Sequence, residues 1–304
     1  MSQAPSPAEQ GQEQIVAAAV GEISSIATLP EITLQIIRLV EDPNSSAQDL
    51  NKVISHDPAL GARILKVVNS AFYGLPGQIG SINRAIVLLG LNAVKNIAIA
   101  ASLAKLFRGG QICAGFSARE LWAHSIAVAS ATRLLAKHVN LNLPDEAFLA
   151  GLIHDIGIMV EVQARRPKFI EAMEKLDATP GLTFRAAEHA TLGANHEQFG
   201  AGLCKAWKFP ASFAYVTGHH HNPMELAAGH RTLACLVHVA DVTAARLGLG
   251  YGRTVECTEI ASDVLDSVGL TPARVEEVAA ALPKAVEEAG AMLTDATAAA
   301  ANAA

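Results

Sequence analysis

Histidine and acidic side chains that can bind a metal ion are numerous in this chain, which has 11 histidines among 304 residues. Two candidates, His154 and Asp155, are adjacent within the apolar run Gly151-Leu152-Ile153-His154-Asp155-Ile156-Gly157. A buried ionised carboxylate is costly unless it is paired or bound to a metal. Imidazole nitrogen and carboxylate oxygen are also ligands that divalent cations accept. The pair therefore indicates either a metal site or a hydrogen-bonded pair in the core.

Further candidate ligands occur at separate places in the sequence. Glu120 and His124 stand four residues apart, so both side chains leave the same face of a helix. Asp241 lies in an apolar run, where it needs a partner. The other candidates are histidines at the ends of expected helices, namely His196, His219, His220 and His221. This number of groups fits two ions that share bridging carboxylates better than one tetrahedral zinc.

Each candidate also has a structural alternative. Glu120 can be a solvated acid in the first turn of a helix, and histidines that follow a helix can interact with its C-terminal dipole. Asp241 can pair with Arg246 or with a backbone amide. The remaining histidines have no second ligand at helical spacing and are interpreted as surface or structural residues: His56, His138, His189, His230 and His238.

The composition favours an all-α fold. Hydrophobic residues make up 51% of the chain, charged residues 17% and aromatic residues 5%, so Ala, Leu, Ile and Val must build the core. Helical periodicity recurs throughout, and no convincing alternation of strands is found. We expect an N-terminal segment (1–25) whose first residues are frayed, two helical lobes (26–110 and 111–290) and an Ala-rich tail (291–304).

Charge and cysteine usage exclude several classes of protein. The net charge of −6 argues against a nucleic-acid surface, which needs a basic stripe. The four cysteines form no Cys-x-x-Cys pair, and this usage is typical of a reducing cytoplasm. The apolar stretch 85–107 is interrupted by Asn92, Lys95 and Asn96, so we expect a buried helix and no membrane span.

From about Leu29 to about Leu249 the sequence resembles the HDOD module, the HD-related output domain of bacterial signalling proteins. The strongest marks are the loop Asn-Ser-Ala-Phe-Tyr-Gly at 69–74 and the pattern Ser81-Ile82-x-x-Ala85-Ile86-x-x-Leu89-Gly90. The order His124, His154-Asp155, Asp241 resembles the ligand pattern of HD-superfamily metal-dependent phosphohydrolases. The resemblance implies that the second lobe is an HD-superfamily helical bundle.

The resemblance also implies a ligand set. HD-GYP cyclic-dinucleotide phosphodiesterases use extra ligands, which Glu120, His196 in a His-x-x-x-Gly segment and a His-His pair match here. The family pattern favours His220 and His221 for that pair, with His219 as the spare. The predicted metal ligands are Glu120, His124, His154, Asp155, His196, His220, His221 and Asp241. His154 and Asp155 are the candidate catalytic residues, and the expected cofactor is two divalent ions, with iron favoured over manganese or zinc.

Two departures from the active relatives bear on catalysis. Ile158 stands where they have Lys, and Asn222-Pro223-Met224-Glu225 stands where they have Gly-Tyr-Pro. A cation that stabilises transition-state charge can contribute several kcal/mol. Lys66, Arg84 or Lys95 from the first lobe could supply the charge of the lost Lys.

HDOD members are usually regarded as regulatory modules without established activity. The prediction is a cytoplasmic signal-transduction module with a dinuclear metal site and weak or absent catalysis, acting on a protein partner in trans or a small nucleotide ligand. The alternatives are a metal-dependent phosphohydrolase that acts on a nucleotide or cyclic dinucleotide, and a metal-free helical interaction domain. Oligomeric state stays open.

Overall fold

The computed structural model describes residues 7–26, 31–71, 73–104, 106–107 and 110–301, and the expected all-α fold is confirmed. Leu29 and Phe72, which belong to the HDOD resemblance, lie outside the described residues, as do both ends of the chain. The elements are α1 (Pro7–Ile26), α2 (Glu31–Glu41), α3 (Ala47–Ser55), α4 (Pro58–Val68), α5 (Ile82–Leu89), α6 (Leu91–Leu103), β1 (Gln111–Cys113), β2 (Phe116–Ser117), α7 (Ala118–His138), α8 (Pro144–Ile153), α9 (Ile156–Ala164), α10 (Arg166–Ala178), α11 (Phe184–Leu192), α12 (His196–Ala206), α13 (Ala211–His219), the 3-10 helix η1 (Pro223–Glu225), α14 (Thr232–Arg246), α15 (Ser262–Val268) and α16 (Pro272–Ala301).

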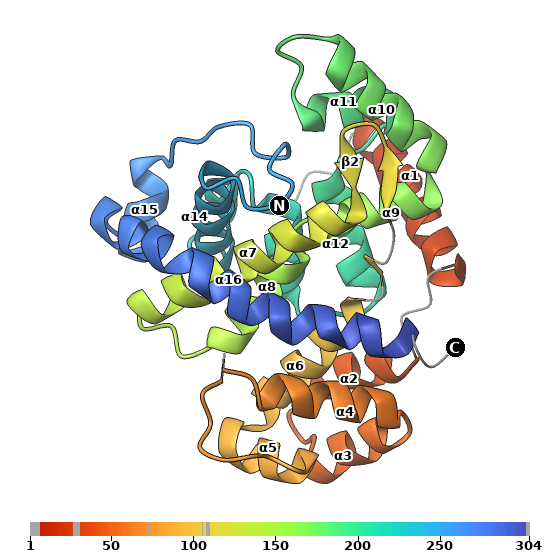
Figure 1. Ribbon diagram of the computed structural model, residues 1–304. Helices are drawn as coiled ribbons and strands as arrows, with labels where there is room; N and C mark the ends of the chain where they lie inside the picture. The colour runs from red at the N-terminus through yellow and green to blue at the C-terminus, as the bar shows by residue number, and fades with distance from the viewer. Residues whose placement is uncertain (1–6, 27–30, 72, 105, 108–109, 302–304) are drawn as a thin grey trace.

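Helices α2–α6 form the lower lobe in Figure 1. Local sequence signals set their boundaries: Ser46 and Asp49 form a capping box at the start of α3, and the Ser81 side chain caps α5. Gly90, at φ 90°, separates α5 from α6 in a conformation that strongly favours glycine. The loop at 69–74 that carries the HDOD resemblance is called the family loop below. Asn69 at its start is fixed to the segment after the loop, because its side chain bonds both the N–H (2.6 Å) and the C=O (2.9 Å) of Ile79.

The second lobe is built around α7, which packs against α8, α14 and α16. Helix α12 packs between α9 and α13, so the segments that carry the candidate ligands surround one interior region. In Figure 1, the long helix α16 crosses the molecule between the two lobes. It contacts α7 of the upper lobe and α4 of the lower one.

The structure corrects two expectations about the N-terminal half. The segment expected to be frayed is helical from Pro7, and α1 packs on α9 and α12 of the second lobe rather than on the lobe that follows it in sequence. A short antiparallel hairpin, β1–β2, was also missed. Its strands span three and two residues, too short for an alternating pattern to be recognised.

The two lobes are joined by specific polar contacts as well as by apolar packing. Tyr73 of the family loop donates a hydrogen bond to Asp145 at the start of α8 (2.9 Å), and the Arg133 guanidinium lies 5.0 Å from the Tyr73 ring centroid. These contacts connect the family loop directly to α8, the helix that His154 follows.

Lys95 has a structural role within the lower lobe. It is 2% exposed and donates hydrogen bonds to Ser45 Oγ and to the Leu39 carbonyl, so it ties α6 to the α2–α3 turn. Burial lowers the pKa of its ammonium group. Lys66 lines a cleft beside α16, and Arg84 is exposed on α5. Because both of its hydrogen bonds lie within the lower lobe, Lys95 does not supply the positive charge that is lost where Ile158 replaces Lys.

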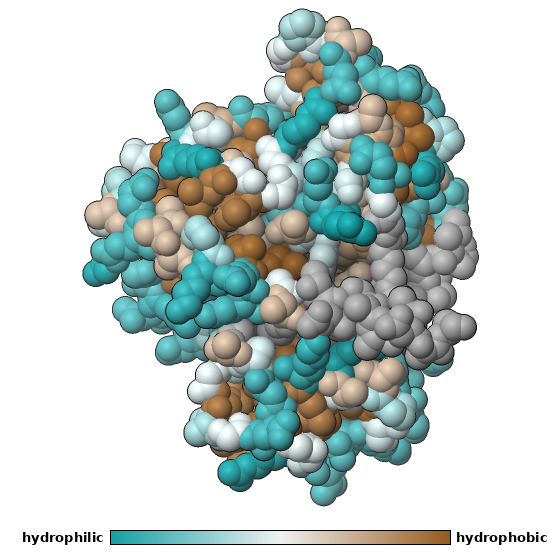
Figure 2. Space-filling view, viewed as in Figure 1, coloured by the Kyte–Doolittle hydropathy of each residue, from teal (hydrophilic) through white to brown (hydrophobic). Residues whose placement is uncertain are grey.

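The segment Pro144–Ala164 is long and apolar enough to cross a membrane by length and composition. In the fold, 89% of its most apolar window is buried, which is the behaviour of a core helix. The face in Figure 2 is mostly hydrophilic, and its hydrophobic residues form separate patches.

Candidate metal centre

Seven of the predicted ligands meet in the interior of the second lobe. We call this group the metal cluster: His124, His154, Asp155, His196, His220, His221 and Asp241. They come from α7, the α8–α9 junction, the start of α12, the end of α13 and α14. The side chains are 0–1% exposed except that of His221, at 7%. The cluster is therefore shielded from solvent.

Asp155 lies between two sets of histidines. Its Oδ1 is 3.3 Å from His220 Nε2 and 3.5 Å from His196 Nε2. Its Oδ2 is 3.3 Å from His154 Nε2 on the other side. One carboxylate thus presents an oxygen to each set, which is the arrangement that a bridging ligand needs.

Asp241 closes the other side of the cluster. Its Oδ1 lies 2.9 Å from His124 Nε2 and 3.8 Å from His154 Nε2, while Oδ2 lies 3.9 Å from His221 Nδ1. His196 Nε2 and His221 Nε2 are 3.0 Å apart. Asp155, His196, His220 and His221 form one possible ligand group. Two further groups of three share Asp155 or His220 with it, and they share His154 with each other.

Several buried polar atoms of the cluster have no hydrogen-bond partner within the described part of the chain. They are His154 Nε2, His220 Nε2, both carboxylate oxygens of Asp155, and Asp241 Oδ2. Buried polar groups are normally satisfied, because leaving one unpaired costs about 1–3 kcal/mol. Five such atoms within one buried cluster fit a site for divalent cations, to which they would be ligands.

The opposite nitrogen of several imidazoles is held by the protein. Nδ1 of His154 donates to the Gly151 carbonyl (2.8 Å), and Nδ1 of His220 to the Val216 carbonyl (3.2 Å). His124 Nδ1 bonds the Leu249 carbonyl in the same way (3.1 Å). A proton on Nδ1 leaves the lone pair on Nε2, so these contacts orient the rings for metal binding.

The structure adds two buried acids that sequence reasoning missed. Glu188 of α11 bonds His196 Nδ1 (2.9 Å) and is 1% exposed. Glu161 of α9 is fully buried, and burial followed by repulsion from Glu188 raises its pKa well above the usual range. The signal for Glu161 was present in the sequence, because it follows the apolar run Ile158-Met159-Val160 just as Asp241 follows Val239-Ala240.

Opposite charges inside the cluster shift several pKa values. Burial alone lowers the pKa of His154, but neighbouring Asp155 outweighs it and raises the pKa to about 8. For His196, Glu188 likewise outweighs burial and raises the pKa to about 9. The histidines in turn hold the pKa of Asp155 well below its usual range despite burial. His221, buried beside two other imidazoles, has a lowered pKa and suits neutral coordination.

The structure does not bring Glu120 into the metal cluster. Its side chain is exposed in the first turn of α7, where the negative charge of the carboxylate interacts favourably with the helix dipole. Its backbone carbonyl accepts a hydrogen bond from Tyr251 (3.1 Å). His219 also points away from the cluster, because its ring is 36% exposed and lies 3.5 Å from Glu225. The geometry thus places His220 and His221, not His219, among the buried groups.

His238, interpreted as a surface or structural histidine, supports the cluster from outside. Its Nδ1 donates to the His220 carbonyl (2.8 Å), which holds the turn that carries His220 and His221.

Two glycines allow the helices that carry ligands to approach closely. A Cβ on Gly157 would lie 1.9 Å from the His196 carbonyl oxygen, so α9 and α12 meet at backbone contact. A Cβ on Gly250 would lie 2.3 Å from the backbone nitrogen of His124, and Gly250 also has φ 75°. Both positions exclude a side chain beside a cluster residue.

Arg185 is the cation that influences the cluster from its edge. It bonds Glu197 (3.1 Å) and both carboxylate oxygens of Glu256 (2.7 and 3.0 Å). The Asn222 amide, oriented to satisfy both of its polar atoms, accepts from Arg185 (3.0 Å) and donates to the His221 carbonyl (3.1 Å). The guanidinium charge is thus balanced by two carboxylates.

A buried histidine–carboxylate cluster inside a two-lobed helical fold defines the class of this protein. The HDOD domain family model matches residues 26–223, about two thirds of the chain, and the chain belongs to this family. The match ends before α14, so Asp241 lies beyond it.

The chain is also similar to individual proteins. An uncharacterised protein of Treponema pallidum (strain Nichols) is 25% identical over 236 residues, which are 77% of this chain and 45% of that protein. A solved structure from Marinobacter aquaeolei VT8, provisionally named a signal transduction protein, has a TM-score of 0.75 at 24% identity, covering 95% of this chain and 66% of that one. Another from Shewanella amazonensis SB2B, provisionally named a phosphohydrolase, has a TM-score of 0.69 at 23% identity, covering 91% and 98%. At these identities the two structures establish the fold.

Proposed function

We propose that this chain is a regulatory module of signal transduction whose metal cluster binds divalent cations and fixes the arrangement of the second lobe. In this proposal, cleavage of phosphodiesters is weak or absent. The output would pass to a protein partner in trans. The provisional name of the Marinobacter relative supports a signalling role. Membership of the HDOD family supports it as well, because HDOD members are usually regarded as regulatory modules.

The observation that carries this proposal is the closure of the metal cluster. No cluster side chain is more than 7% exposed, whereas a phosphodiester must reach the metal ligands to be cleaved. Ile158, where the active relatives have Lys, is fully buried and offers no hydrogen-bond donor. Arg185 is engaged by Glu197 and Glu256 and does not present a free charge. A site built in this way holds an ion more readily than it admits a substrate.

We propose two ions, because Asp155 presents one oxygen to each set of histidines. His196, His220 and His221 would hold one ion, His124, His154 and Asp241 the other, and Asp155 would be shared. Such ions supply Lewis acidity and neutralise the carboxylates. Mixed imidazole and carboxylate ligation is compatible with iron, manganese and zinc, with iron favoured by the family resemblance.

Elemental analysis of untagged protein tests the metal proposal. We expect two ions for each chain in the wild type and none in the Asp155→Ala variant, because the shared carboxylate is then missing. A content well below one ion for each chain, after purification in buffers supplemented with iron, manganese or zinc, would contradict the proposal.

A metal-dependent phosphohydrolase is the second candidate. The seven-residue ligand cluster and the provisional name of the Shewanella relative favour it. A steady-state assay of metal-loaded protein with cyclic and linear dinucleotides distinguishes the two functions. Multiple turnovers that disappear in Asp155→Ala would establish the hydrolase and overturn the regulatory proposal.

A further inference from the structure

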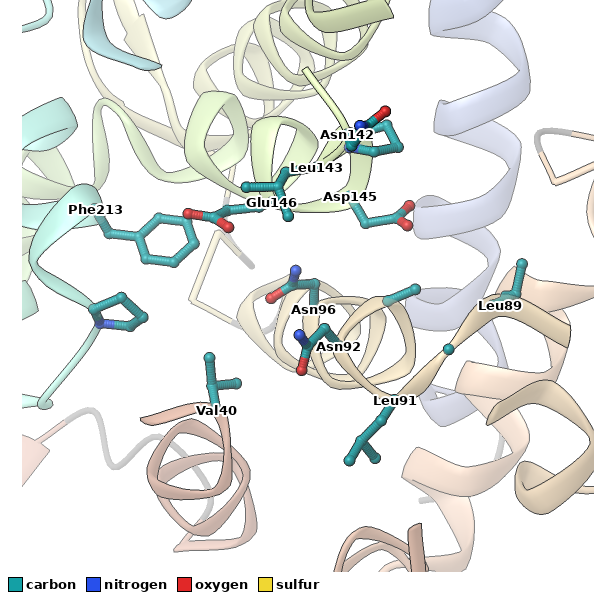
Figure 3. Close-up of a pocket in the computed structure, with 14 residues that line it drawn as sticks. Val40, Leu89, Leu91, Asn92, Asn96, Asn142, Leu143, Asp145, Glu146 and Phe213 are labelled. Atoms are coloured by element: carbon teal, nitrogen blue, oxygen red, sulfur yellow. The ribbon is translucent and has the colours of Figure 1, made fainter. Parts of the chain in front are cut away.

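A second site lies between the lobes, away from the metal cluster. It is a cavity of about 780 Å³. Its walls come from the start of α6 in the lower lobe and from the starts of α8 and α13 in the upper lobe. In Figure 3, Asn92 and Asn96 project from α6 into a space that Glu146 and Phe213 face from the opposite side. This volume is within the range typical of small-molecule sites.

The cavity contains hydrogen-bonding groups that the fold does not use. Asn96 is 8% exposed, and its amide forms no hydrogen bond with any described residue. Most of the Asn96 side chain is buried, but its amide borders the cavity, so its donor and acceptor remain open to a ligand. Asn92 and Asn142, at the rim, have equally free amides within the described part of the chain.

Two carboxylates determine the charge of the cavity. Asp145 accepts a hydrogen bond from Tyr73 (2.9 Å), and Glu146 Oε1 accepts one from Ser212 (3.1 Å). No hydrogen bond from a described residue reaches Glu146 Oε2, and no described lysine or arginine lines the cavity. The Arg133 guanidinium lies 3.9 Å from Asp145 Oδ1 and partly balances that carboxylate, whereas Glu146 forms no ion pair with a described residue. A carboxylate without a neighbouring cation disfavours phosphates and favours a ligand that donates hydrogen bonds to it.

The walls are otherwise apolar, and the aromatic ring of Phe213, 1% exposed, lies at one side. A planar ligand can pack on such walls while its edge meets the polar groups. A carboxylate accepts from two neighbouring N–H groups, and an asparagine amide donates to a carbonyl or ring nitrogen. A guanine base has this combination of groups on its edges.

We propose that the interlobe cavity binds an uncharged, planar heterocycle of the guanine type, with Glu146 accepting from adjacent N–H donors and Asn96 bonding the carbonyl edge. This site is separate from the metal cluster and does not depend on the proposed metal. Its position is significant, because α8 and α13 both begin at the cavity and are followed directly by His154 and His220. A ligand here would contact both lobes and the two helices that position the cluster.

Calorimetric titration of full-length protein with guanosine tests the site. We expect saturable binding with a Kd below about 1 mM, weaker binding of inosine and adenosine, and no gain from the phosphate of GMP. Asn96→Leu and Glu146→Gln should each weaken guanosine binding about tenfold or more. Asn92→Leu, at the exposed rim, gives a variant whose folding does not depend on a buried amide and should also weaken binding.

Asn51→Leu on α3, outside the cavity, is the matched control and should bind guanosine as the wild type does. Circular dichroism and melting temperature verify that each variant is folded. Three results would overturn the proposal. They are no saturable guanosine binding up to about 1 mM, Asn96 and Glu146 variants that bind guanosine as tightly as the wild type, and tighter binding of GMP than of guanosine.

Discussion

At the scale of single residues, the imidazoles of the metal cluster depend on partners that are not themselves candidate ligands. Three of the five rings are oriented by backbone carbonyls, and another, that of His196, is oriented by the Glu188 carboxylate. A carboxylate makes the ring more basic than a carbonyl does, so Glu188 has the larger influence on metal affinity.

Replacing Glu188 should therefore weaken metal binding without removing a ligand. Glu188→Gln keeps an oxygen for His196 Nδ1 but removes the charge. We expect metal affinity to fall about 10–100-fold, measured by competition with a chelator of known affinity. Glu174→Gln, an exposed acid on α10, should leave the affinity unchanged. Equal affinities for the wild type and the Glu188 variant would show that His196 needs no charged partner.

Glu161 makes stability dependent on pH. Its pKa in the folded protein is raised well above the usual 4.5, so the neutral form is the stable one when buried. Its stabilising contribution is complete below about pH 4.5 and is lost as the pH rises toward the folded-state value. Glu161→Gln keeps the neutral shape and removes the cost of ionisation.

We therefore expect the Glu161→Gln variant to melt at a higher temperature than the wild type at pH 8, with the difference shrinking toward pH 4.5. The measurement is a series of thermal melts of chelator-treated protein across this range. Glu276→Gln, exposed on α16, is the control and should follow the wild type at every pH. A wild type that remains the more stable protein at pH 8 would contradict a neutral Glu161.

At the scale of elements, the metal cluster depends on how closely α9 and α12 approach. Gly157 allows the contact, since any side chain there would collide with the His196 carbonyl. Gly157→Ala should force the helices apart, lower the free energy of unfolding by about 1–3 kcal/mol and reduce metal content, because His196 opens α12.

Denaturant unfolding and elemental analysis of the same preparations measure both effects. Gly229→Ala is the matched control, because a Cβ there would have no heavy atom of a described residue within 4 Å. A Gly157→Ala protein with the stability and the metal content of the control would show that the helix contact tolerates expansion.

At the scale of the whole molecule, the metal cluster connects segments that are far apart in sequence. His124 and Asp241 are separated by 117 positions, yet His124 Nε2 and Asp241 Oδ1 lie 2.9 Å apart. Metal that binds only the folded state adds stability in proportion to the logarithm of its concentration, about 2.7 kcal/mol at one hundred times its Kd.

Chelation should therefore lower the melting temperature of the full chain. Scanning calorimetry with and without a chelator measures the change, and metal analysis of the starting protein establishes its loading. Asp155→Ala should show no response to the chelator. Identical melting of loaded and stripped wild-type protein would mean that the cluster does not hold the second lobe together.

Much of the fold is determined locally and could be predicted from the sequence. Caps such as Ser46, Ser81 and Asn195 act on backbone groups within three residues, so they are legible in the sequence. The family loop and the order of the HD residues also predicted the HDOD family, which is confirmed. The apolar surroundings of Asp155 and Asp241 correctly indicated burial, because an acid in an apolar helix has few other positions available.

Only the tertiary structure decided which candidates meet. Helical spacing placed Glu120 on the face of His124, but solvent exposure depends on which segments cover that turn, and Glu120 remains outside. Local spacing does not distinguish the three consecutive histidines, although the family resemblance favoured His220 and His221. The packing of α13 against α12 and α14 places these two inside and His219 outside. Glu188 reaches His196 because α11 and α12 are joined by a tight turn at Gly193 (φ 82°). Burial and distance between such groups are set by the packing of whole helices, which no local pattern contains.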